Sequence, residues 1–151
     1  MSIEDWMPAL ADTFGQITGM EQVHTFENLP AVLTVFPCTV IVPVRGWMNY
    51  SAGGPNLGLH SVQATVYAAA QVLPEAYSEA VPFIGRVTRK LAATMTLGGR
   101  VVHALPDPDG PFYQGPGGID YGTDARGAPR KHLGIIFLLE VKERETYTVS
   151  A

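Results

Sequence analysis

Four histidines and four aspartates are the residues of this chain whose types could support metal chemistry. The histidines are His24, His60, His103 and His132, and the aspartates of one Gly/Pro-rich stretch are Asp107, Asp109, Asp120 and Asp124. No two histidines have the i, i+4 spacing of a helical metal site, and Cys38 is the only cysteine. The aspartates lack the spacing and the closing glutamate of a calcium loop, and Asp-Pro and Asp-Gly are common turn formers. The sequence therefore predicts no metal site and no cofactor.

The motifs of nucleotide-binding and hydrolytic enzymes are also missing from the sequence. Gly53, Gly54 and Gly58 are not followed by the Lys-Ser or Lys-Thr pair of a phosphate-binding loop, and no serine lies in a G-x-S-x-G turn. We therefore expect no catalytic residues and predict that the protein is not an enzyme. One alternative stays open, a small metal-dependent enzyme that uses His103, His132 and the clustered aspartates, provided that the two histidines face each other on neighbouring strands.

Composition is typical of one globular domain. The 151 residues are 46% apolar and 16% charged, with a net charge of -4, so one domain over residues 1–151 is expected. An acidic balance argues against nucleic-acid binding by bulk charge. The beginning of the chain does not resemble a secretory signal, and no window holds about 18 uninterrupted apolar residues. These features predict a soluble protein of a reducing cytoplasm that does not contact membranes, with Cys38 in its core.

Two helices are expected to position the remaining elements. Apolar residues at helical spacing predict an N-terminal helix over about residues 3–18. A second, central helix begins at Pro82 and ends at Gly98 and Gly99, because glycine accepts the left-handed conformation that closes a helix. Its apolar stripe is Ile84, Val87, Leu91 and Met95. A short helical turn beginning at Pro74 is expected to precede it.

Strands account for most of the other apolar runs. A short extended piece is expected around residues 23–26, and residues 31–44 predict either two short strands or one strand with a bulge, since Pro37 and Pro43 interrupt them. Proline cannot donate to a β-ladder, so this run should have an unpaired side that a partner could cover. Strict alternation predicts a half-buried strand over residues 59–69, and further strands are expected at 100–105 and from His132 onward. This order predicts an α+β fold, with a mainly antiparallel sheet carrying both helices on one face.

Two long Gly/Pro-rich loops are predicted, at residues 45–58 and 106–131, and both carry aromatic residues. Large apolar side chains on a loop are costly unless a partner or the loop's own domain covers them. A basic cluster on the outer side of the central helix could contact acidic regions of a neighbouring subunit around Glu21, Glu27 or Asp107. The residues expected at a subunit or partner interface are Trp47, Met48, Tyr50, Arg86, Arg89, Lys90, Phe112, Tyr113 and Tyr121.

The chain resembles the tail terminator and head-to-tail joining proteins of long-tailed phages. The resemblance rests on the N-terminal helix, the LPAVLTVFP segment at residues 29–37, the alternating strand at 59–69, the helix that closes in TLGGRVV at residues 96–102, and the last long strand. Members of this family have a sheet flanked by helices and assemble as a hexameric ring on the end of the tail tube. Smaller members have a shorter loop where this chain has residues 106–131.

The resemblance implies a structural virion protein, assembled in the host cytoplasm and located in the tail or neck. It would form a homo-oligomeric ring, contact the tail tube protein and the head-tail connector protein, and stop tube growth. DNA would pass through the lumen without specific binding, which suits the acidic balance of the chain. A connector or stopper ring on the head side, built on similar principles, is the alternative from the same group of proteins.

Overall fold

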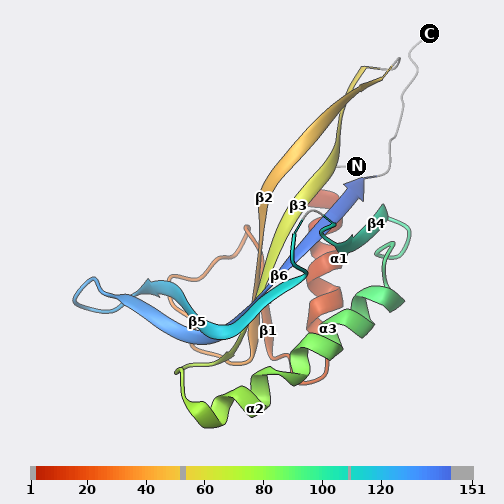
Figure 1. Cartoon of the computed structure of the whole chain (residues 1–151). Coiled ribbons are helices and arrows are strands. Elements are labelled where there is room, and N and C mark those ends of the chain that lie inside the picture. Colours follow the sequence, from red (N-terminus) through yellow and green to blue (C-terminus); the bar gives the residue numbers. More distant parts are fainter. Residues whose placement is uncertain (1–2, 52–53, 109, 144–151) are drawn as a thin grey trace.

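The computed structural model describes residues 3–51, 54–108 and 110–143 (Figure 1). The helices are α1 (Ile3–Gly15), the 3-10 turn η1 (Pro74–Ala76), α2 (Tyr77–Ala80) and α3 (Pro82–Ala93). The strands are β1 (Gln22–His24), β2 (Cys38–Ser51), β3 (Gly54–Ala69), β4 (Val101–Pro106), β5 (Tyr113–Thr123) and β6 (Pro129–Glu143). Among the described residues, no helix has the length and apolar character needed to span a membrane.

All six strands form one sheet, in the order β1-β2-β3-β6-β4, with β5 also paired to β6. The β1–β2 pair is parallel, and every other pair is antiparallel. β4 pairs with residues 139–143 of β6 and β5 with residues 129–137, so the two strands follow each other along the same side of β6. The fold is therefore α+β with a mainly antiparallel sheet, as the sequence predicted.

The helices pack on one face of the sheet, because their apolar stripes and the alternating residues of β3 and β6 bury each other (Figure 1). α1 contributes Trp6, Leu10 and Phe14, which have no exposed surface, and α3 contributes the buried Phe83, Val87 and Leu91. The inward residues of β6 are Leu133, Ile135, Phe137, Leu139 and Val141, all fully buried. This face holds the main core of the protein.

A smaller apolar cluster lies apart from the main core, around Leu33, Cys38, Val40 and Tyr67. Residues 31–37 and the C-terminal half of β5 contribute to it: the Tyr121 hydroxyl donates to the carbonyl of Pro30 over 2.5 Å, and its ring meets Tyr67 edge-on at 5.8 Å. The next residue, Gly122, has a φ of +67°, and a Cβ there would lie 2.5 Å from the carbonyl oxygen of Ala31. Only glycine fits this close approach, so Tyr121 and Gly122 together fasten the β5–β6 hairpin to residues 30–31.

Both helices end earlier than the sequence predicted. α1 ends at Gly15 and not near residue 18, and α3 ends at Ala93 and not at Gly98. The Thr94 side chain bonds back to the Lys90 carbonyl over 2.7 Å, and Leu97, Gly98 and Gly99 all have positive φ angles. A side chain that competes for helical carbonyls favours an end at that point, and the glycines shape the loop that follows. Met95 is consequently 44% exposed and lies outside the apolar stripe.

The prediction of long loops at residues 45–58 and 106–131 was also wrong. Both regions are largely β-structure. β2 and β3 form a continuous hairpin whose paired residues include Trp47 with Leu59 and Ser51 with Gly54. Glycine and proline are tolerated in β5 because β6 is its only strand partner among the described residues, and irregularities in register occur at two points along it.

Only the second half of the run at residues 31–44 is a strand, so the predicted strand was wrong for residues 31–37, and the predicted bulge lies at Pro43. Residues 31–37 carry no strand, and β2 begins at Cys38 with a register shift after Pro43. β1 pairs with β2 only from Cys38 to Val40, so from Ile41 onward the outer side of β2 has no strand partner in the described part of the chain. The expected unpaired side is therefore present.

Candidate functional site

Strand β2 carries three of the residues predicted at an interface, Trp47, Met48 and Tyr50. Val44 and Trp47 are 55% and 41% exposed, although both are large apolar residues. The guanidinium of Arg45 lies over the Trp47 ring, 5.2 Å from its centroid. The backbones of Met48 and Tyr50 belong to β2, while their side chains lie outside the described part of the structure. This strand combines an open hydrogen-bonding edge with exposed apolar surface, the two features that favour pairing with another chain.

The predicted basic cluster borders an open groove of about 300 Å³ between α3 and the end of α1. Arg86 donates to the carbonyl of Thr18 over 3.2 Å, and its guanidinium lies 5.0 Å from the centre of the Phe83 ring. Arg89 is exposed and Lys90 half-buried beside it. Part of this cluster therefore has a structural role, because Arg86 satisfies a carbonyl just beyond the C-terminus of α1.

The three aromatic residues predicted between positions 106 and 131 have different surroundings. Phe112 is half-buried and packs on Phe137, with ring centres 5.4 Å apart. Tyr113 begins β5 and is 42% exposed. Tyr121 is half-buried, and its hydroxyl bonds to Pro30. Of the three, Tyr113 is the residue most accessible to a partner.

An apolar stripe that runs along η1 and α2, including the residues on either side of them, was not predicted from the sequence. Leu73, Tyr77 and Val81 recur at helical spacing and are 41%, 36% and 50% exposed, while Ala76 and Ala80 on the opposite side are buried in the core. The i, i+4, i+8 spacing of these three apolar residues indicates a helical stripe. In this segment, only a short helical turn beginning at Pro74 was predicted. The β2–β3 hairpin extends away from α2, toward the opposite end of the molecule (Figure 1).

The suggested pairing of two histidines across neighbouring strands was wrong. His103 lies opposite Lys142 in the sheet, with its Nε2 3.4 Å from a Glu140 oxygen, whereas His132 lies opposite Ile119. Nδ1 of His132 is 2.8 Å from the carbonyl oxygen of Ala70. No group of three or more His, Cys, Asp or Glu side chains within the described residues is arranged to hold a metal ion.

A buried polar cluster joins the start of α1 to β3 and the end of β6. The Trp6 Nε1–H donates to Oε1 of Glu143 over 2.8 Å, and Nε2 of His60 lies 2.9 Å from the same oxygen. The Trp6 and His60 rings also contact each other, with centres 5.4 Å apart. His60 and Glu143 are 2% and 6% exposed, so this cluster is part of the interior and acts on stability.

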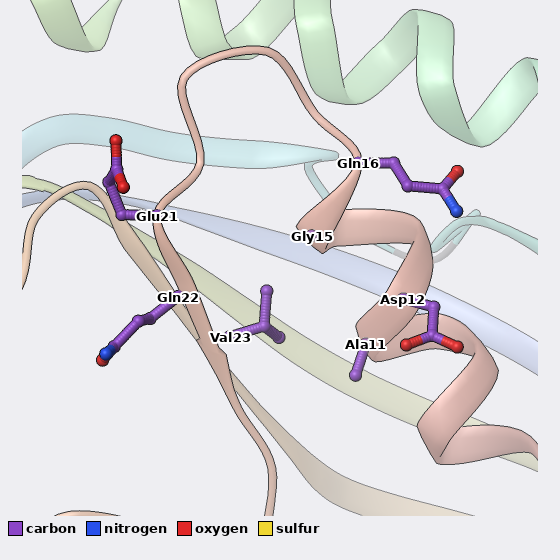
Figure 2. Close-up of a pocket in the computed structure, with 7 residues that line it drawn as sticks. All are labelled: Ala11, Asp12, Gly15, Gln16, Glu21, Gln22 and Val23. Atoms are coloured by element: carbon purple, nitrogen blue, oxygen red, sulfur yellow. The ribbon is translucent and has the colours of Figure 1, made fainter.

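A groove with a volume of about 390 Å³ lies between α1 and β1 (Figure 2). Val23 projects from β1 into the space between the two elements, where Ala11 also lies. Glu21 projects on the far side of β1, and Asp12 on the far side of α1. The groove thus has an apolar centre, and the two carboxylates point away from it.

Burial strongly affects the ionisation of Cys38 in the smaller cluster. Burial raises the pKa of its thiol from 9.0 to about 11, and burial, reinforced by Tyr121, raises the pKa of Tyr67 to about 12. The unfolded chain ionises Cys38 at lower pH than the folded chain does. The contribution of the Cys38 thiol to the free energy of unfolding is therefore complete below pH 9. It is lost as the pH rises toward 11.

We expect the free energy of unfolding to fall by about 1.4 kcal/mol between pH 8 and pH 10 because of Cys38 alone. Urea titrations of the wild type and of Cys38→Val at both pH values measure this difference. The Cys38→Val protein, which has no thiol to ionise, should lose correspondingly less stability over the same interval. Equal losses in both proteins would show that Cys38 does not ionise in this range.

No family model matches the sequence, and no curated protein matches it.

Proposed function

We propose that this chain is a structural virion protein that forms a ring at the head-proximal end of a phage tail. In this role it stops growth of the tail tube and joins the tail to the head connector. The ring is built from copies of the chain, six in number as the family resemblance implies. It holds no cofactor and performs no catalysis, and DNA passes through its lumen without specific binding.

The observation that carries the proposal is the open side of β2. From Ile41 onward this side has no strand partner in the described part of the chain, and the same stretch of β2 contains the exposed Val44 and Trp47. A sheet edge with exposed apolar side chains is a surface that proteins cover or use for pairing. A ring of subunits supplies that cover when the open edge of each copy contacts a different surface of its neighbour.

Two further features support assembly through unlike surfaces. The exposed residues Leu73, Tyr77 and Val81 belong to α2 and its flanks, and Trp47 belongs to β2, whose hairpin with β3 extends away from α2 (Figure 1). The β2–β3 and β5–β6 hairpins also project beyond the helix-covered core (Figure 1). Contacts between different patches of identical subunits are heterologous, and heterologous contacts generate rings when the rotation closes.

The proposal predicts that the purified protein associates into a species of about six times its 16.2-kDa subunit mass and binds the ends of tail tubes. Light scattering over a range of concentrations measures the mass, and electron microscopy with added tubes shows the location. Because Trp47→Asp places a charge on the exposed side of β2, it should weaken association and tube binding together.

The matched control is Met95→Asp, which places the same charge between α3 and β4, where Met95 is 44% exposed. This variant should associate as the wild type does, and circular dichroism confirms that both variants are folded. A wild-type protein that stays monomeric and never joins a tube would disprove the proposed function. Equal effects of the two substitutions would disprove the assignment to β2.

A further inference from the structure

We infer that residues 144–151 of one copy add as a strand to the open edge of β2 in the next copy. This inference rests on the proposed ring and identifies one of its subunit contacts. The edge is defined as residues 44–51, the part of β2 that follows Pro43. The segment is defined as residues 144–151, which follow β6 and lie outside the described residues. The edge and the segment are thus equal in length.

The edge offers backbone groups that no strand of its own copy uses in the described part of the chain. β1 pairs with β2 only from Cys38 to Val40, and β3 occupies the other side of β2 as far as Ser51. Only alternate residues of an antiparallel strand bond to a given neighbour, so half of the N–H and C=O groups of the edge point outward. Such an edge is a template for one further strand.

The segment has the composition of a strand. Residues 146–149 are Thr-Tyr-Thr-Val, all of types that favour β-structure. In an added strand Tyr147 and Val149 would share one face, because side chains alternate between faces. The edge contains the exposed Val44 and Trp47. Pairs of aromatic and β-branched residues on neighbouring strands stabilise a sheet, so these apolar side chains of segment and edge are suited to each other.

The segment of the same copy cannot fill this edge along its whole length. It begins beside Glu143, whose carboxylate accepts from the Trp6 indole N–H in the interior. β3 and β2 lie between β6 and the edge, so a strand added there would be about 14 Å from β6. Because an extended residue spans about 3.4 Å, this crossing would use about half of the segment. The segment of a neighbouring copy need not cross its own sheet.

A nearer position in the same copy, beside residues 54–58 of β3, is a poorer partner for a strand. β6 pairs with β3 as far as Leu59, and the preceding residues of β3 are Gly-Pro-Asn-Leu-Gly. Pro55 has no N–H to donate, and glycine weakens a strand. The edge of β2 has no proline and only one glycine, Gly46. The edge is therefore the better template, and the contact that it makes is heterologous.

Two variants with complementary defects test the contact. The segment variant is Tyr147→Pro with Thr148→Pro, because two successive prolines remove an N–H that the ladder needs whichever alternate residues face the edge. The edge variant is Trp47→Asp, which places a charge on the apolar contact surface. Each variant alone should associate about 100-fold more weakly than the wild type, because the added strand is lost.

The mixture of the two variants should form a dimer of about twice the 16.2-kDa subunit mass and no larger species. The intact segment of the edge variant binds the intact edge of the segment variant. The segment and the edge left over are both defective, so the assembly stops there. Sedimentation velocity of each variant and of the equimolar mixture measures all three cases.

The matched control is Tyr147→Phe with Thr148→Val, which changes the same two positions but keeps both N–H groups, an aromatic ring and a β-branched side chain. It should associate as the wild type does, and circular dichroism confirms that all variants are folded. A segment variant that associates as well as the wild type, or no better than this control, disproves the contact while the proposed ring stands. A mixture that stays monomeric or grows beyond a dimer also disproves the contact. A wild type that never associates disproves the ring and the contact together.

Discussion

Replacing Glu143 by alanine is expected to lower the free energy of unfolding by about 3 to 5 kcal/mol. Its Oε1 is the acceptor for the Trp6 indole N–H at 2.8 Å and lies 2.9 Å from Nε2 of His60. Glu143→Ala leaves the Trp6 indole N–H and Nε2 of His60 without this partner in the interior and removes side-chain volume as well. Urea denaturation at pH 7, followed by Trp fluorescence and circular dichroism, measures the loss.

Two further variants separate the buried contact from a general effect of charge. Glu143→Gln keeps the size of the side chain and one acceptor oxygen, so its cost should be smaller, about 1 to 2 kcal/mol. Glu140→Ala removes a more exposed carboxylate of the same strand, which lies 3.4 Å from His103. Its cost should stay within about 1 kcal/mol. Comparable losses for Glu143→Ala and Glu140→Ala would contradict an energetic role for the buried cluster.

The role of Glu143 was missed although part of its signal is in the sequence. Alternation along the last strand places Ile135, Phe137, Leu139 and Val141 on one face, and Glu143 is the next residue of that series. A carboxylate at the end of an apolar run was interpreted as the polar end of the strand. Its partners lie 137 and 83 residues away along the chain, so only the packing of α1 on the sheet identifies them.

Local periodicity predicted the fold class and the positions of most elements, because helices and half-buried strands carry their own pattern. It failed where pairing is decided by a distant strand. Gly115, Gly117 and Gly118 look like loop residues, yet they belong to β5, and β6 gives Gly117 and Gly118 their register partners. The same limitation applies to residues 45–58, whose strands are recognisable only as a hairpin.

Interface residues were predicted from aromatic content, and this criterion cannot tell exposed rings from buried ones. Trp47 and Tyr113 are exposed, whereas Phe112 packs on Phe137 and Tyr121 holds the base of the hairpin. The groove beside α1 could not be predicted at all, because Asp12 and Glu21 border it only once α1 and β1 are packed together. Predicting a surface requires the fold, whereas a strand's buried face can be predicted from alternation alone.

The helix-covered face of β6 is the basis of a second prediction. Phe137→Ala is expected to lower the free energy of unfolding by about 3 to 5 kcal/mol. Phe137 has no exposed surface and lies in β6 between Ala64 of β3 and Tyr113 of β5. Its ring packs on Phe112 at 5.4 Å. Truncation leaves a cavity that the small Ala64 side chain cannot fill, and urea denaturation measures the loss.

Leu138→Ala is the matched control, because Leu138 is the next residue, points to the other face of the sheet and is half-buried. It should cost less than half as much as Phe137→Ala. Phe112→Ala and the double variant complete a thermodynamic cycle, in which the two rings should show a coupling of about 0.5 to 1.5 kcal/mol. Equal costs at positions 137 and 138 would mean that the helix-covered face is not the main core. Strictly additive losses at positions 112 and 137 would mean that the two rings do not stabilise each other.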